Sequence, residues 1–138
     1  MLDRNVLLLA AEGCDMPDLP HTLSQYSNLT RLQTLGELRN LLRNGEYDAL
    51  FCAESLRSET WRTVVAEVHK LSPGLPVIIV SRNGGEKEWL EVLAAGAFDL
   101  LVPPYGQRQV LSLLEHAASS RMAKDWQKVP PPSAAKAC

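Results

Sequence analysis

The sequence lacks any long uninterrupted apolar segment. No stretch approaches the roughly 18 apolar residues that a membrane-spanning helix needs. The first apolar run, Val6 to Ala11, is also too short for a signal peptide because Glu12 and Asp15 interrupt it. We therefore expect a cytoplasmic protein that does not enter the membrane.

Cysteine and histidine are scarce and scattered. The cysteines, Cys14, Cys52 and Cys138, have neither the even count nor the spacing of a disulfide framework or a zinc site. The histidines show no metal-ligand spacing to one another or to the cysteines. We expect reduced thiols, no metal ion, no cofactor and no catalytic triad, with Cys52 as an inert core residue because it lies in an apolar run.

The chain also lacks an excess of charge of one sign. Its 14 basic and 16 acidic residues give a formal net charge of -2, so no general electrostatic attraction draws it to nucleic acid or to an anionic membrane. Of its 138 residues, 46% are hydrophobic and 22% are charged. This composition is typical of one globular domain that buries a core.

What the sequence does contain is a series of short apolar runs that alternate with segments of helical periodicity. Each run is too short for a helix, and the alternation is typical of a parallel sheet covered on both faces. We expect four clear strands and a weaker fifth at Asn28 to Leu32. The four clear runs are Val6–Leu9, Ala49–Cys52, Pro76–Val80 and Phe98–Val102.

Between the strands, apolar residues recur at helical spacing. Pro17 and Pro20 limit the first helix to a short piece between Met16 and Tyr26. Helices on both faces and the handedness rule for crossovers favour a doubly wound α/β fold with strand order 2-1-3-4-5, whose functional sites lie beyond the carboxyl ends of the strands. The other helices are expected around Leu35–Leu42, Trp61–Leu71, Trp89–Leu93 and Val110–Ala117.

The end of the chain differs in composition. Apolar periodicity stops near Lys124, and Val129 to Ala135 is rich in proline and alanine. We interpret residues 1–122 as one folded domain and residues 123–138 as a linker or disordered tail. Within that tail, Trp126 is a candidate contact with a following domain or a partner.

Three segments, in order and at suitable separations, resemble the receiver domain of bacterial response regulators, the CheY-like module of two-component signalling. Tyr47 to Phe51 is similar to the family's third strand and Leu75 to Ser81 to its fourth. Ala94 to Tyr105 is similar to its Gly-Ala-x-Asp-Tyr-Leu-x-Lys-Pro-Phe pattern. The resemblance covers Asn5 to Arg121 and implies a flavodoxin-like three-layer α/β/α sandwich with a five-stranded parallel sheet.

The resemblance also implies which positions would carry chemistry. The family uses a phosphoacceptor carboxylate after the third strand, an acidic pair after the first that holds a divalent cation, a hydroxyl after the fourth that takes up a phosphoryl oxygen, and a lysine after the fifth. Alignment puts Ala53 at the acceptor and Pro103 at the lysine. Ala10 and Ala11 fall on the acidic pair, and only Ser81 matches. We predict a pseudo-receiver that has lost aspartyl phosphorylation.

Two glutamates lie one place beyond the lost carboxylates. Glu12 and Glu54 would form a shifted acidic pair only if both strand ends bulge, because a shift of one residue turns a side chain to the other face. Solvated loop glutamates are the plainer interpretation. The family's aromatic switch position in the fifth strand is Leu100 here. At Pro103-Pro104, which replaces a Lys-Pro pair, we predict a cis peptide bond.

A scaffold without its chemistry predicts an interaction module rather than an enzyme. We expect it to act in signal transduction by binding a protein partner or by controlling an attached output domain, such as that of a transcription regulator. The last helix carries more apolar residues than one sheet face needs, which predicts a homodimer through the face made by the fourth helix, fifth strand and fifth helix. The candidate interface residues are Leu100, Tyr105, Val110, Leu111 and Leu114.

Two alternatives remain open. The chain could be phosphorylated at a non-standard residue such as Glu54 or Ser55, or it could sense a small ligand in the crevice beyond the strands. No direct contact with nucleic acid is expected from this domain.

Overall fold

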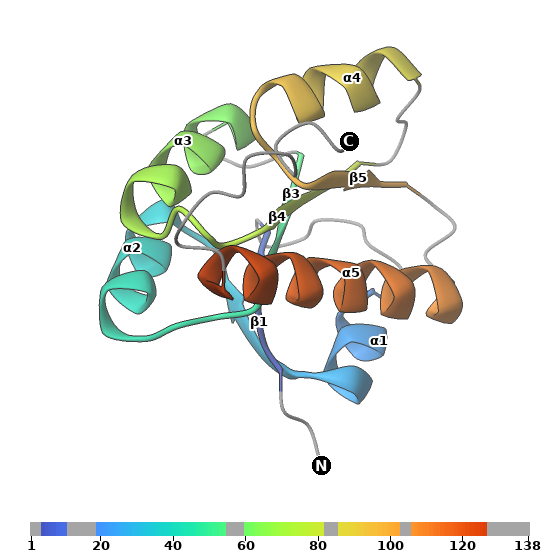
Figure 1. Cartoon of the computed structure of the whole chain (residues 1–138), viewed down its shortest axis with the longest axis horizontal. Helices are drawn as coiled ribbons and strands as arrows, with labels where there is room; N and C mark the ends of the chain where they lie inside the picture. Colours follow the sequence, from blue (N-terminus) through green and yellow to red (C-terminus); the bar gives the residue numbers. More distant parts are fainter. Residues whose placement is uncertain (1–3, 11–18, 55–59, 82–85, 103–105, 127–138) are drawn as a thin grey trace.

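Strands and helices alternate along the chain, from β1 to α5 (Figure 1). The computed structural model describes residues 4–10, 19–54, 60–81, 86–102 and 106–126, with residues 120–126 described by their backbone. The strands are β1 (Asn5–Leu9), β2 (Asn28–Leu32), β3 (Ala49–Ala53), β4 (Val77–Val80) and β5 (Asp99–Leu101). The helices are α1 (Leu19–Tyr26), α2 (Leu35–Asn44), α3 (Trp61–Leu71), α4 (Glu86–Ala94) and α5 (Gln107–Trp126).

The five strands form one parallel sheet in the order β2-β1-β3-β4-β5. This is the predicted order, and the weaker strand expected at Asn28 to Leu32 is confirmed as β2. The register pairs Leu9 of β1 with Cys52 of β3, and Ala53 of β3 with Val80 of β4. The carboxyl ends of these three central strands therefore lie side by side at one edge of the sheet.

Two apolar layers enclose the sheet. Because side chains alternate between the faces of a strand, Phe51 and Ile78 enter the layer beneath α1 and α5, while Leu50 and Ile79 enter the layer beneath α2 and α3. Figure 1 shows α1 and α5 together on one side of the sheet. Every residue of β3 and β4 is buried, which explains why these strands are continuous apolar runs rather than alternating ones.

Threonine side chains determine where α2 and α3 begin. The hydroxyl of Thr34 accepts a hydrogen bond from the Glu37 N–H, and the Glu37 carboxylate accepts from the N–H groups of Gln33 and Thr34, which completes a capping box. These backbone hydrogen bonds, the one from Gln33 first, lower the pKa of Glu37. Thr60 caps α3 in the same position by accepting from the Thr63 N–H.

The turn between α4 and β5 requires a glycine. Gly96 has a φ of 105°, in the left-handed region that side chains rarely adopt. A Cβ atom at this position would also collide with Cε1 of His69, which belongs to α3. The glycine at this position therefore also lets α3 approach the start of β5.

Helix α5 is longer than the sequence predicted. Residues 123–126 were assigned to the tail, but their backbone is helical and Trp126 is the last residue of α5. The prediction relied on apolar periodicity, which stops earlier. Alanine, lysine, arginine and methionine favour helix without an apolar stripe, and Arg121 to Lys124 consists of these residues.

Candidate functional site

Three of the predicted site positions lie at the carboxyl edge of the sheet. Ala53 is the last residue of β3. The N–H of Ala10 donates to the carbonyl of Leu32 at 3.0 Å, and the N–H of Ser81 donates to the carbonyl of Leu101 at 2.9 Å. Backbone hydrogen bonds between strands thus continue one residue past β1 and β4. The predicted positions outside the described residues are Ala11, Glu12, Ser55, Pro103 with its predicted cis bond to Pro104, and Tyr105.

Ala53, which the sequence resemblance aligns with the phosphoacceptor, carries a buried methyl group. Ala53 is 1% exposed and Ala10 is 8% exposed, and both belong to the apolar layer beneath α1 and α5. Neither side chain has an oxygen that could attack a phosphoryl group or bind a cation. Within the described ranges, no group of three or more His, Cys, Asp and Glu side chains is arranged around a common point.

Glu54 and Ser81 meet at this edge and form the Glu54–Ser81 pair. The Ser81 hydroxyl donates a hydrogen bond of 2.8 Å to Oε1 of Glu54. Ser81 is buried and Glu54 is half-buried, so the Glu54 carboxylate is held by a hydrogen bond while part of the side chain stays in contact with solvent. The register pairs Ala53 with Val80, and the residues that follow them therefore lie next to each other.

The pair was not predictable from the spacing of its members, which are 27 residues apart in the sequence. The sequence signal that does point to it is indirect. Glu54 directly follows the acceptor position and Ser81 matches the family's hydroxyl. Only the register of two parallel strands converts these positions into neighbours.

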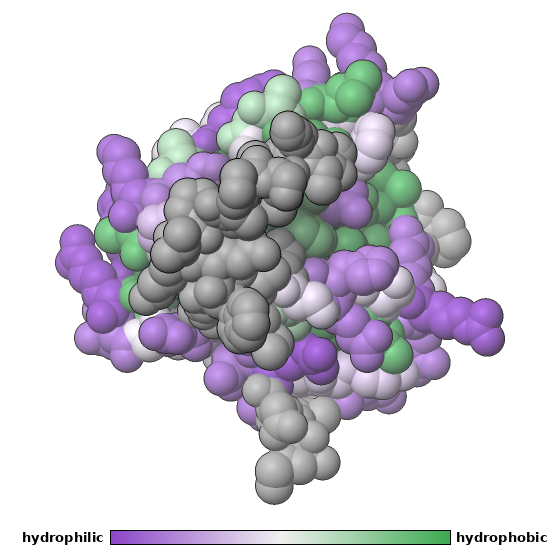
Figure 2. Space-filling view, viewed as in Figure 1, coloured by the Kyte–Doolittle hydropathy of each residue, from purple (hydrophilic) through white to green (hydrophobic). Residues whose placement is uncertain are grey.

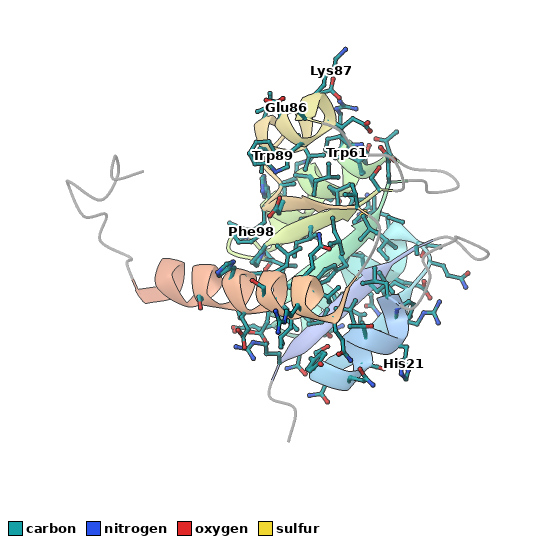
Figure 3. The ribbon with its side chains drawn as sticks, turned by 90° about the vertical axis from the view of Figure 1, so that its right-hand side faces the viewer. His21, Trp61, Glu86, Lys87, Trp89 and Phe98 are labelled. Carbon is teal, nitrogen blue, oxygen red and sulfur yellow. The ribbon has the colours of Figure 1, made fainter. Side chains whose placement is uncertain are left out.

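A second polar contact joins α4 to β5. The indole Nε1 of Trp89 donates to Oδ1 of Asp99 at 3.0 Å, and the same oxygen accepts from the Leu100 N–H at 2.7 Å. Trp89 nevertheless keeps 41% of its surface exposed, and its neighbour Leu90 keeps 52%. Figure 3 shows Trp89 on α4 and Phe98 just before β5 on the same side of the molecule. The sequence placed Trp89 on an apolar stripe but did not indicate Asp99 as its partner.

Most of the apolar side chains of α5 are used inside the chain. Val110 and Leu114 are 0% exposed and pack in the layer beneath α1 and α5. The expectation that these two residues face a partner is wrong, because the sheet and α1 already cover them. Leu100 and Leu111 are half-buried. Among the described residues, the large apolar side chains that stay exposed are Trp89 and Leu90 of α4, and Figure 2 shows green apolar surface in that region among purple polar residues.

Cys52 lies in the layer beneath α2 and α3. Its side chain is 0% exposed, and this burial raises the pKa of its thiol to about 12. The thiolate, which is the nucleophilic form, is therefore strongly disfavoured at neutral pH. Cys52 contributes packing rather than chemistry.

Comparison with known proteins identifies the architecture. No family model and no curated protein matches the sequence. Solved structures do match. The signal receiver domain of a putative Luxo repressor protein from Vibrio parahaemolyticus has a TM-score of 0.76 at 14% identity, over 94% of this chain and 100% of that chain.

Two further solved structures give the same result. The CheY-like response regulator receiver domain protein from Methanospirillum hungatei JF-1 has a TM-score of 0.72 at 18% identity, over 90% of this chain and 99% of that chain. The beryllofluoride-activated NtrC4 receiver domain dimer has a TM-score of 0.74 at 17% identity, over 85% and 98% of the two chains. The chain has the receiver fold.

This result confirms the predicted flavodoxin-like, CheY-like class. At such low identities the likeness establishes the receiver fold alone, and function has to be argued from the site. One receiver neighbour is described as a dimer. A search of the described part of the chain found no helix with the length and apolar character of a membrane span.

Proposed function

We propose that this chain is a pseudo-receiver domain of a two-component response regulator, and that it acts through protein contacts without aspartyl phosphorylation. The observation that carries the proposal is Ala53. Its methyl group lies at the end of β3, where the sequence resemblance expects the acceptor, and it is buried in the core. A methyl group has no lone pair with which to attack a phosphoryl donor, so the domain has to signal through its surface.

The surface proposed for this contact is the face formed by α4, β5 and α5. It contains the exposed side chains of Trp89 and Leu90 and the half-buried Leu100 and Leu111. Large aromatic side chains fixed at an exposed site are favoured as interface anchors, and the Asp99 carboxylate fixes the Trp89 indole. We propose that a second copy of the chain occupies this face, in a cytoplasmic protein that controls a partner or an attached output domain.

Treatment of the purified chain with acetyl phosphate and Mg²⁺, followed by intact-mass measurement, tests the loss of phosphorylation. A receiver with an intact acceptor aspartate serves as the positive control and gains the mass of one phosphoryl group. We expect no gain for this chain. A metal-dependent gain would contradict the proposal.

The same experiment separates the proposal from the alternative acceptor. Glu54 is the described carboxylate closest in sequence to the acceptor position, and it lies half-buried at the site edge. If the chain gains mass and Glu54→Gln does not, Glu54 is the acceptor and the domain is an atypical phosphoreceiver. If both gain mass, the modified residue is found by peptide mapping.

A further inference from the structure

The Ser81 hydroxyl already has an acceptor for its single proton. Its Oγ donates to Oε1 of Glu54 at 2.8 Å, within the normal range for O–H···O bonds, and Ser81 is 1% exposed. A hydrogen bond to an ionised carboxylate is stronger than one between neutral groups, and partial burial reduces the competition from water. While Glu54 accepts this proton, the Ser81 hydroxyl has no second proton to donate.

We propose that the Glu54 carboxylate accepts the hydrogen bond of Ser81 in place of a phosphoryl group. The carboxyl ends of β3 and β4 then stay in one conformational state without phosphorylation. The inference rests on the proposed function, because the family's hydroxyl is implied to take up a phosphoryl oxygen after phosphorylation. Here an oxygen of the chain itself fills that role. Glu54 is a positioning residue, and it acts through Ser81.

Backbone and side-chain contacts connect this pair to the exposed surface. The N–H of Ser81 donates to the carbonyl of Leu101 in β5 at 2.9 Å. Two residues earlier in the same strand, Asp99 accepts from the indole of Trp89. Figure 3 shows Trp89 on α4 beside the strands. A displacement of Ser81 is therefore expected to move β5 and with it the anchor of the Trp89 indole.

The experiment uses the indole N–H resonance of Trp89 in ¹⁵N–¹H correlation spectra of the full chain. Ser81→Ala removes the donor and Glu54→Leu removes the acceptor. We expect each variant to displace the Trp89 resonance, and the double variant to displace it as far as one single variant rather than by the sum. Glu54→Gln keeps an acceptor oxygen and is expected to cause a smaller displacement. Glu115→Gln, an exposed change on α5, is the matched control and leaves the resonance in place.

A folded Ser81→Ala or Glu54→Leu variant whose Trp89 resonance stays at the wild-type position would overturn the inference, as would additive displacements in the double variant. The dispersion of the backbone amide resonances shows whether each variant is folded. If Glu54→Leu does not fold, Glu54→Gln and Ser81→Ala still give the comparison.

The phosphoryl-donor treatment distinguishes this failure from failure of the proposed function. If the wild-type chain is modified and its Trp89 resonance moves, phosphorylation is intact and both ideas fail. If the chain is not modified and the variants do not displace the Trp89 resonance, the pseudo-receiver proposal stands. The proposed role of Glu54 is then contradicted.

Discussion

Burial makes Cys52 a group whose proton affinity depends on folding. In the folded chain the pKa of its thiol is about 12, compared with an ordinary value of 9.0, because desolvation penalises the thiolate. Folding therefore retains a proton that the unfolded chain loses in alkaline solution. By linkage, the resulting contribution to stability is complete below pH 9 and is lost as the pH rises toward 12.

This predicts that the free energy of unfolding depends on pH differently in the wild-type chain and in Cys52→Ala. Between pH 9 and pH 11 the free energy of unfolding of the wild type should fall more steeply, by up to about 1.4 kcal/mol per pH unit. Urea unfolding at several pH values measures both slopes. Cys52→Ala removes the titrating thiol and keeps every other ionisable group. The difference between the two slopes therefore reports on Cys52 alone. Parallel slopes would contradict the assigned cause.

At the same scale, the sequence identified some residues and missed others for a physical reason. Ala53 and Ser81 could be placed because Ala53 ends one recognisable apolar strand and Ser81 directly follows another. The partners of Ser81 and Trp89 could not, because Glu54 and Asp99 acquire their roles through strand register and helix packing. The local sequence does not indicate such contacts.

Among the secondary-structure elements, α2 begins where one threonine, Thr34, caps it. The Thr34 hydroxyl accepts the Glu37 N–H, and the Glu37 carboxylate accepts the Thr34 N–H in return. Without the hydroxyl, the first turn loses an acceptor for a backbone donor that has no partner within the helix.

Thr34→Ala is expected to lower the free energy of unfolding by about 1 kcal/mol. Urea unfolding at neutral pH measures the change. Ser112→Ala, an exposed substitution within α5, is the matched control and should leave stability unchanged or slightly raised, because alanine favours helix interiors. Equal losses in the two variants would show that the capping box contributes nothing specific.

The sequence predicted elements well wherever burial produced a pattern. The apolar runs of β3 and β4 are buried on both faces, and their short length together with their continuous apolar composition distinguishes them from helices. The final turns of α5 left no such signal. The predicted tail therefore begins before the end of the helix, because apolar spacing alone does not indicate these turns.

At the scale of the whole molecule, the exposed apolar surface determines how the chain can associate. Two of the α5 residues expected at the interface, Val110 and Leu114, are buried inside the chain. The proposed dimer therefore depends on α4, where Leu90 is 52% exposed and Trp89 is 41% exposed. A charge placed among these side chains would have to be desolvated on association.

Leu90→Arg is therefore expected to weaken self-association by about tenfold or more, as measured by sedimentation equilibrium over a range of concentrations. Ala66→Arg places the same charge on an exposed position of α3, and it should leave association unchanged. A wild-type chain that stays monomeric at high concentration would remove the dimer from the proposed function. Equal weakening by both variants would instead assign the effect to net charge.

The burial of Ala53 would also make the proposed loss of phosphorylation hard to reverse. Ala53→Asp would insert a carboxyl group into an apolar layer, where desolvation favours its protonated, non-nucleophilic form. The neighbouring serine would still be engaged by Glu54, and Ala10 would still offer no ligand for a cation. Ala53→Asp alone is therefore not expected to restore the reaction.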